Sequence, residues 1–486
     1  MKIGNQPLDK LYAELTYPVL NCMRNFHYDT LLNALLKRLN RPQKSDGLID
    51  ELCQLPWVVE RLLLWLLADD CFKYRYCFNG GINSFTLDQL IIYANQSISS
   101  LYEDHIKIHT TSLFVRQGFL SQMPYQKNLD VHDFAFQLYV IAKLNTNSKL
   151  RKYLNERAGM PIDLYLQMAL IFWKHTNQDK PWFDKRYINS MRLIFPEKEL
   201  NIFISSFTSS VQDLSKKLSI RTVELDEWFQ PVIFYKTPCI LFDDAISPFG
   251  RPTLRRYFEN ILGDWLEEEN SNCLQDYDSM IENYVKAGLQ RCNVNFLDEK
   301  GINQLTSSSD RVCDFMIDES DGFFLIEVKN KALTKKTPSS SHPVPITSKL
   351  GKTIISGINQ LDITLAKLKT LSKFNHPNYY QIIVTKNDLW LGNANAFSSN
   401  SNDVDPVWLL TLSDMDHFIE LVRDKRTTFC SFFKDLAVRR KIPSESVFTV
   451  SMLLKKHPYK LNQIPSHLIV ELDKLVDTIK SKTTYI

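Results

Sequence analysis

The feature that most constrains the fold of this chain is a pair of short apolar runs around a cluster of turn-forming residues. Asp314 lies in the first run, Glu327 and Lys329 lie in the second, and residues 318–322 between them read Asp-Glu-Ser-Asp-Gly. Runs rich in β-forming residues on both sides of such a cluster predict a β-hairpin. Because side chains alternate between the two faces of a strand, Glu327 and Lys329 share one face and can meet Asp314. Two buried acids and a lysine in one place are costly without a metal ion or a substrate charge, so we expect a functional site here.

Length and composition indicate a cytoplasmic protein of several domains. A chain of 486 residues is expected to form two or three domains, and a net charge of +3 restricts any nucleic-acid surface to a local patch. The nine cysteines include no C-x-x-C pair, so we expect reduced thiols. No signal peptide is expected at the N-terminus. The most apolar window, residues 55–67, is too short to cross a membrane and predicts a buried helix, so no membrane contact is expected.

Changes in the sequence pattern divide the chain into four expected parts. The first shows helical periodicity throughout and predicts an all-α domain that serves as a sensor or scaffold. The last predicts a helical segment with ten Lys and Arg against five acidic residues, which suits contact with phosphates as well as a solvated face. The expected parts are a helical N-terminal domain (1–222), a connector with short strands at 232–235 and 239–242 (223–252), an α/β domain (253–428) and the basic helical C-terminal segment (429–486).

Residues 275–425 predict the order α-β-β-β-α-β-β-α, which is typical of an α/β domain with a mixed sheet. The stretch 333–349 is rich in Lys, Ser, Thr and Pro and predicts a mobile loop after the hairpin. Besides the hairpin, the expected elements are helices at 277–289, 353–372 and 415–423 and strands at 293–297, 379–385 and 407–412.

The acidic residues of the hairpin suit a hard divalent cation, Mg²⁺ or Mn²⁺. Asp314 and Glu327 can share one ion, with the carbonyl oxygen of Val328 and water completing its coordination. Such an ion lowers the pKa of a bound water and neutralises charge that develops during phosphodiester hydrolysis. Lys329 would then either hold the attacking water or contact the scissile phosphate, and both roles stay open. Gln360, in the helix after the hairpin, would orient that water or Lys329, or else be a solvated glutamine.

This arrangement resembles the PD-(D/E)xK nuclease superfamily, whose members have the restriction-endonuclease-like fold. Asp314 takes the place of the Asp of the first motif, and Glu327-Val328-Lys329 is similar to the ExK triplet. Gln360 matches the glutamine often found in the helix that follows this triplet. The sequence departs from the pattern at Cys313, where the family motif has proline. The resemblance covers residues 275–425, about a third of the chain.

The resemblance also implies an acid from an upstream helix, and two glutamates are candidates. Glu282 lies one helix and one strand before Asp314, as the family's order requires, and is the preferred metal ligand. Glu259, on the preceding helix, is the rival. Either one can instead be an exposed helix glutamate.

The resemblance implies a Mg²⁺- or Mn²⁺-dependent endonuclease that hydrolyses phosphodiester bonds, with double-stranded DNA as the expected substrate. The whole layout, a long helical first half before a nuclease domain, is also similar to nucleases of bacterial antiphage defence systems. That similarity implies a helical half that senses or recruits, and a homo-oligomer or a defence-system protein as partner. The alternative function is a non-catalytic DNA-binding or assembly protein built on a degenerate nuclease fold.

Overall fold

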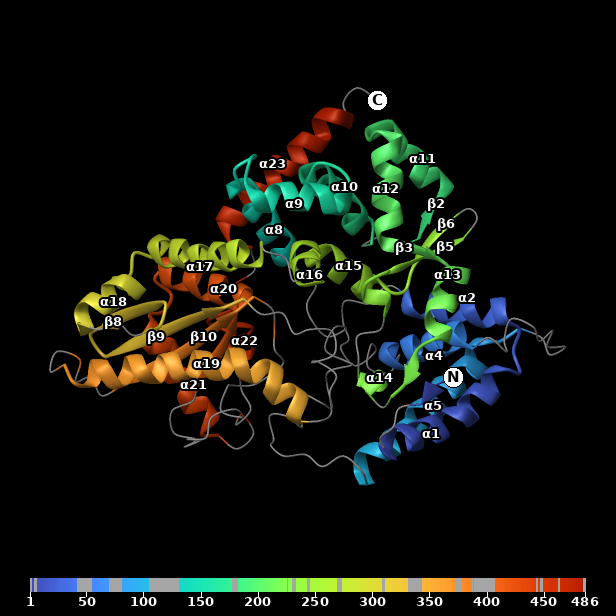
Figure 1. Cartoon of the computed structure of the whole chain (residues 1–486), viewed down its shortest axis with the longest axis horizontal. Helices are drawn as coiled ribbons and strands as arrows, with labels where there is room; N and C mark the ends of the chain where they lie inside the picture. Colours follow the sequence, from blue (N-terminus) through green and yellow to red (C-terminus); the bar gives the residue numbers. More distant parts are fainter. Residues whose placement is uncertain are drawn as a thin grey trace.

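The computed structural model describes most of the chain, in segments separated by gaps. In Figure 1 the sheet of residues 296–411 lies on the left and the helices of the first hundred residues lie on the right, as two separate groups. Helices from both halves of the chain join these groups along one edge. The described segments are residues 2–3, 7–41, 55–69, 81–104, 131–176, 182–224, 226–229, 233–242, 245–268, 273–307, 311–330, 343–371, 374, 378–386, 388, 407–442, 445, 449–461 and 464–483.

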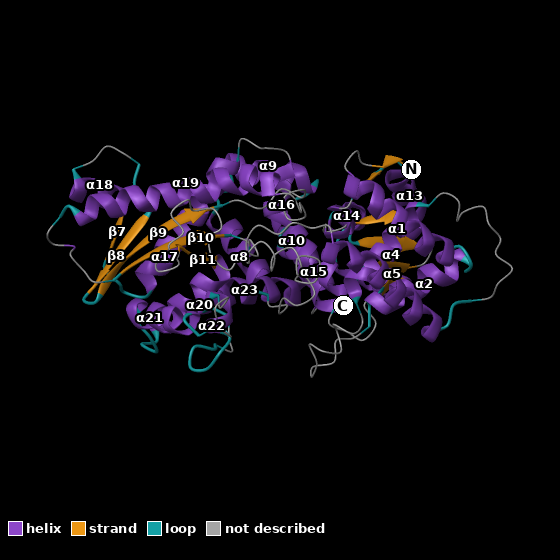
Figure 2. Ribbon diagram, turned by 90° about the horizontal axis from the view of Figure 1, so that it is seen from below, coloured by secondary structure: helices purple, strands orange, loops and turns teal. Residues whose placement is uncertain are grey.

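The hairpin predicted from the sequence lies at the centre of a five-stranded mixed sheet, in the order β11-β10-β9-β8-β7. Strands β7, β8 and β9 are antiparallel, whereas β9, β10 and β11 are parallel (Figure 2). The turn between β8 and β9 pairs Glu319 with Gly322. A Cβ atom on Gly322 would lie 2.8 Å from the carbonyl oxygen of Asn378, so only glycine fits at this approach. The strands are β7 (Phe296–Asp298), β8 (Phe315–Glu319), β9 (Gly322–Lys329), β10 (Tyr379–Thr385) and β11 (Val407–Thr411).

Helices cover both faces of this sheet. They are needed on both, because β9 has consecutive apolar residues whose side chains point alternately to the two faces. Phe323 and Leu325 pack into a core with α19 (Pro343–Lys369), whereas Phe324 and Ile326 face the side of α17 (Leu274–Arg291) and α20 (Leu412–Arg423). Figure 1 shows α17 and α19 on opposite sides of the strands. The predicted order of elements is thus present, with one additional helix, α18 (Glu299–Thr306), between β7 and β8.

Two expectations about loops and caps need correction. The predicted loop 333–349 is helical from Pro343, where α19 begins; residues 333–342 lie outside the described residues. Helix α20 begins at Leu412, three residues earlier than predicted. Thr411 caps it through a capping box with Asp414, so both side chains satisfy backbone N–H groups of its first turn.

The first part of the chain is mainly helical, but it is not all-α. Strands β2 (Phe183–Asp184) and β3 (Thr208–Ser210) join β5 (Cys239–Phe242) and β6 (Ala245–Pro248) in a four-stranded sheet ordered β2-β6-β5-β3. A second, two-stranded sheet pairs β1 (Lys2–Ile3) with β4 (Thr222–Val223). Strands of two or three residues are too short to show a period of two, which is why the sequence pattern missed them. The strand expected at 232–235 is a 3₁₀ helix over Ile233–Tyr235, with residue 232 outside the described segments.

The remaining helices surround these sheets. Those of the first half are α1 (Pro7–Met23), α2 (Tyr28–Leu39), α4 (Pro56–Ala68), α5 (Ser84–Asp104), α8 (His132–Lys143), α9 (Lys149–Ala158), α10 (Ile162–His175), α11 (Lys185–Ile194), α12 (Glu197–Phe207) and α13 (Val211–Ser219). The others are α14 (Asp226–Phe229), α15 (Arg251–Glu259), α16 (Ile261–Glu268), α21 (Phe429–Arg440), α22 (Val450–Leu454) and α23 (Ser466–Thr483).

The hydrophobic cores group the chain differently from the four expected parts. One core contains helices α1, α2, α4 and α5 with α13 and the residues around β5. A larger core runs from Phe134 in α8 to Leu468 in α23, and it includes α10, α12, α15, α17 and one face of the five-stranded sheet. The helices of residues 131–207 therefore pack with the α/β unit, and the helical C-terminal segment packs there too. Helix α23 lies against α8 (Figure 1).

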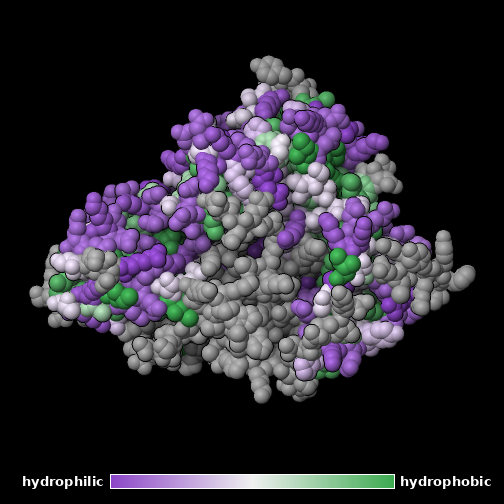
Figure 3. All heavy atoms as spheres, viewed as in Figure 1, coloured by the Kyte–Doolittle hydropathy of each residue, from purple (hydrophilic) through white to green (hydrophobic). Residues whose placement is uncertain are grey.

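A helix that spans a membrane must be long and mostly apolar. None of the described helices has the length and apolar content needed for a transmembrane span. Figure 3 shows a face on which most described residues are hydrophilic and the apolar ones lie in small separate groups.

Candidate active site

The hairpin brings Asp314 and Glu327 face to face. Asp314 directly precedes β8, and the pairing of Phe315 with Ile326 continues by one residue to place Asp314 opposite Glu327. The backbone N–H of Val328 donates to Asp314 Oδ2 over 2.6 Å, which orients this carboxylate. The sequence predicted that Val328 would offer its carbonyl oxygen to a metal ion. In the structure its backbone N–H also orients the Asp314 carboxylate.

Lys329 lies between Glu327 and Gln360. Its ammonium group donates to Glu327 Oε1 and, over 2.9 Å, to Gln360 Oε1. Gln360 is 6% exposed and donates in turn to the carbonyl oxygen of Val312 over 3.3 Å. A solvated role for Gln360 is excluded by this burial. Four of the predicted side chains, Asp314 and these three, therefore form one cluster at the carboxyl end of β9.

Burial raises the pKa of both hairpin carboxylates. Glu327 is 1% exposed, and its burial together with the charge of Asp314 raises its pKa to about 8, against the opposing charge of Lys329. Burial also raises the pKa of Asp314 to about 6, with a contribution from Glu282 and an opposing one from the Val328 N–H. Such pKa shifts are expected when two neighbouring carboxylates are buried and positive charges compensate theirs only in part.

One oxygen of this pair lacks a hydrogen bond within the described part of the chain. Glu327 Oε2 is buried and lacks a hydrogen-bond partner among the described residues. A divalent cation between the two carboxylates would satisfy this oxygen and offset their repulsion, so the oxygen donors present fit Mg²⁺ or Mn²⁺. Within the described segments no group of three or more His, Cys, Asp and Glu side chains is arranged to hold a metal ion, and the metal stays a prediction.

The two candidates for the upstream acid have different surroundings. Glu282 is an exposed residue of α17; partial burial and the charge of Glu299 raise its pKa, and its own charge acts on Asp314. Glu259 is 4% exposed on α15, where it accepts a hydrogen bond of 3.2 Å from Trp173 Nε1 in α10. Of the two, Glu282 is therefore the candidate on α17, the helix that packs on β9 of the hairpin. Glu299, in the first turn of α18, is a further acid here, and it escaped notice because α18 itself was not predicted.

Two residues of α19 that the sequence pattern missed support the cluster. A Cβ atom on Gly357 would lie 3.5 Å from Lys329 Cε and 3.6 Å from Glu327 Cγ, so the helix passes close to both side chains. Thr364 is fully buried; its hydroxyl accepts from the N–H of Cys313 over 2.9 Å and donates to the carbonyl oxygen of Gln360. Both lie three or four residues from Gln360 on one helix face, and this spacing was the available signal.

Comparisons of the chain with protein-family models, with curated proteins and with solved structures found no match.

Proposed function

We propose that this protein is a Mg²⁺- or Mn²⁺-dependent endonuclease that hydrolyses phosphodiester bonds in DNA. The observation that carries the proposal is the cluster of Asp314, Glu327, Lys329 and Gln360, in which Glu327 retains a buried oxygen without a partner. Such a cluster is destabilising as it stands, and a divalent cation or a phosphate group would satisfy it.

Each residue of the cluster has a chemical role in this proposal. Asp314, Glu327, the carbonyl oxygen of Val328 and Glu282 would hold the metal ion; its chemistry would be to lower the pKa of a bound water and to offset negative charge on the phosphate. Lys329 holds the attacking water or contacts the phosphate, and Gln360 fixes the direction of its ammonium group through the bond to Gln360 Oε1. The burial of Gln360 and Glu327 keeps this geometry preorganised.

The arrangement of elements supports the resemblance to the PD-(D/E)xK superfamily. Helix α17 precedes three antiparallel strands, and α19 leads to a parallel fourth strand, β10. The resemblance to antiphage nucleases supports a role in bacterial defence against phage or foreign DNA, in the cytoplasm. Cutting both strands of a duplex with one site per chain favours a homo-oligomer, and a defence-system protein is the other partner we propose.

Plasmid cleavage tests the proposal. The purified full-length chain would be incubated with supercoiled plasmid and Mg²⁺ or Mn²⁺, beside the variants Asp314→Asn and Lys329→Ala. Asp318→Asn is the matched control, because Asp318 is an exposed aspartate of β8, the strand that directly follows Asp314. We expect cleavage by the parent and the control, and a loss of at least about 100-fold in the two site variants.

The outcomes separate the proposal from its alternative. Equal cleavage by Lys329→Ala and the parent would show that another site carries the activity. DNA binding that falls with salt and persists in EDTA, with no cleavage and no Mn²⁺ uptake by calorimetry, would instead support a non-catalytic DNA-binding or assembly protein.

A further inference from the structure

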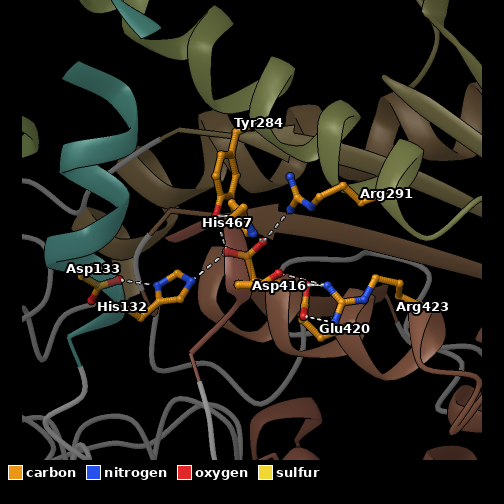
Figure 4. Close-up of polar contacts among 9 residues, drawn as sticks. His132, Asp133, Tyr284, Arg291, Asp416, Glu420, Arg423 and His467 are labelled. Carbon is orange, nitrogen blue, oxygen red and sulfur yellow. Dashed lines mark hydrogen bonds and ion pairs between the residues drawn. The ribbon is translucent and has the colours of Figure 1, made fainter. Parts of the chain in front are cut away.

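A second buried cluster lies around Asp416 of α20, where α8, α17 and α23 meet this helix (Figure 4). Asp416 is 2% exposed, and side chains from three other helices approach its carboxylate. His132 Nε2 of α8 lies 2.7 Å from Oδ2, and the hydroxyl of Tyr284 in α17 donates to the same oxygen. Arg291 of α17 lies 3.5 Å from Oδ1, and His467 Nε2 of α23 lies 4.0 Å from it. We call these five residues the Asp416 network.

The network ties elements that are far apart in the sequence. His132 belongs to the first half of the chain, Tyr284 and Asp416 belong to the α/β unit, and His467 belongs to the C-terminal segment. Tyr284 makes contacts of two kinds. Its hydroxyl lies 2.8 Å from His467 Nε2. Its ring packs edge-on against the rings of Phe136 and Tyr139 in α8, with ring centroids 4.9 and 5.0 Å apart. A buried polar network in which the hub carboxylate is well bonded holds its helices in one arrangement.

Helix α17 connects this network to the candidate active site. Residues two apart on a helix differ by about 200° around its axis, so Tyr284 and Glu282 point to nearly opposite sides. Accordingly, Tyr284 is 2% exposed, whereas Glu282 is exposed. The helix itself packs on β9 of the hairpin, and Asn330, directly after β9, donates to Asp278 of α17 over 2.5 Å. Any shift or rotation of α17 at Tyr284 therefore moves the Glu282 carboxylate relative to the hairpin.

We propose that Tyr284, Asp416 and His132 are positioning residues for the candidate metal site. They fix α17 on its buried side, and α17 then presents Glu282 to the ion held by Asp314 and Glu327. Through His132, helix α8 of the first half of the chain also helps to hold α17, and so Glu282, in place at the candidate metal site. This inference rests on the proposed function, because it requires a metal ion that is coordinated in part by Glu282.

Calorimetric titration of the full-length chain with Mn²⁺ alone tests this positioning role. Tyr284→Phe removes the hydroxyl and keeps the ring, and we expect Mn²⁺ affinity to fall about 10-fold, as for other groups that orient metal ligands. Tyr165→Phe is the matched control, since Tyr165 is a fully buried tyrosine of α10 whose hydroxyl bonds Ser206 over 2.7 Å. It is expected to lose comparable thermal stability and to bind Mn²⁺ like the parent.

A double-mutant cycle with Glu282→Gln distinguishes positioning from a general loss of structure. If Tyr284 acts through Glu282, adding Tyr284→Phe to Glu282→Gln weakens Mn²⁺ binding no further. His132→Gln, in a different helix, provides a second variant should Tyr284→Phe fold poorly, and it is expected to behave in the same way.

The outcomes for this inference and for the proposed function are separable. A parent that takes up no Mn²⁺ refutes the metal site and the inference with it. A parent that binds Mn²⁺ while Tyr284→Phe and His132→Gln bind it equally well refutes the positioning role alone. Weakening that persists in the Glu282→Gln background, or that Tyr165→Phe shares, refutes it as well.

Discussion

His132 is expected to make the stability of this protein depend on pH above neutrality. Burial by itself would lower its pKa, but hydrogen bonds to Asp133 and Asp416, and their charges, raise the pKa to about 10. Its other neighbours in the network do not compete for the proton. Burial lowers the pKa of His467 to about 4, so that ring is neutral, and burial raises the pKa of Tyr284 well above its ordinary value. Arg291 is a further charge beside Asp416.

The sign and size of the effect follow from linkage. Since the pKa of His132 is higher in the folded chain than its ordinary value of 6.5, its contribution is complete below about pH 6.5 and is lost as the pH rises toward 10. At about 1.36 kcal/mol per pH unit, the loss between pH 7 and pH 9 amounts to about 2.5 kcal/mol. With an unfolding entropy of about 2.1 cal/mol/K per residue, that corresponds to about 2–3 °C in the melting temperature of a chain this long.

His132→Gln isolates this contribution, because glutamine stays neutral while the other titrating groups are shared with the parent. Melting temperatures of both proteins would be measured at pH 7 and at pH 9, in EDTA and at equal concentration. We expect the parent to melt above the variant at pH 7, and the difference to narrow by about 2–3 °C at pH 9. A difference that is the same at both pH values, or wider at pH 9, would refute the assignment of a charged His132 bound to Asp416.

The other predictions concern the site and its supports. Lys329→Ala should lower plasmid cleavage by at least about 100-fold and leave calorimetric Mn²⁺ binding in place, because an ammonium group is not a metal ligand. Gly357→Val should lower cleavage and the melting temperature together, since its Cβ alone would lie 3.1 Å from Ile383 Cδ1 and its methyl groups would crowd Lys329 and Glu327. Thr364→Val leaves the buried N–H of Cys313 without its acceptor and should cost about 1–3 kcal/mol in urea unfolding, whereas Thr364→Ser should cost less. Glu319→Ala removes the acceptor for the first two N–H groups of α21 and should cost about 1 kcal/mol by the same measurement.

The parts of the fold that could be predicted from the sequence are those with strong local patterns. The apolar run at 379–385 is the observed strand β10, and the turn formers at 318–322 mark the observed hairpin. Side-chain alternation was enough to place Glu327 and Lys329 on one face, and the structure joins them by an ion pair. Gln360 was expected near Lys329 through the resemblance, and its amide oxygen accepts from that lysine.

The parts that could not be predicted depend on contacts between distant residues. Strands β2 and β3 have two and three residues, and they exist only because β5 and β6 supply their partners. The burial of His132 and Asp416 results from packing between helices 284 residues apart in the sequence, which leaves no local pattern. Gly357 was overlooked for a similar reason, since its close approach to the hairpin is a property of how α19 packs on the sheet.

The large core that runs from α8 to α23 has a consequence for synthesis of the protein. A ribosome releases residues 131–207 long before Leu468 and the apolar residues of α23 that cover α8. Until then, helices such as α8 expose apolar surface. Chaperones bind such partly folded chains, and the exposed surface favours aggregation. A premature stop codon just before Ser466 would make that state permanent. Such a truncation, although it leaves every residue of the hairpin site in place, is expected to remove the protein from the cell by degradation.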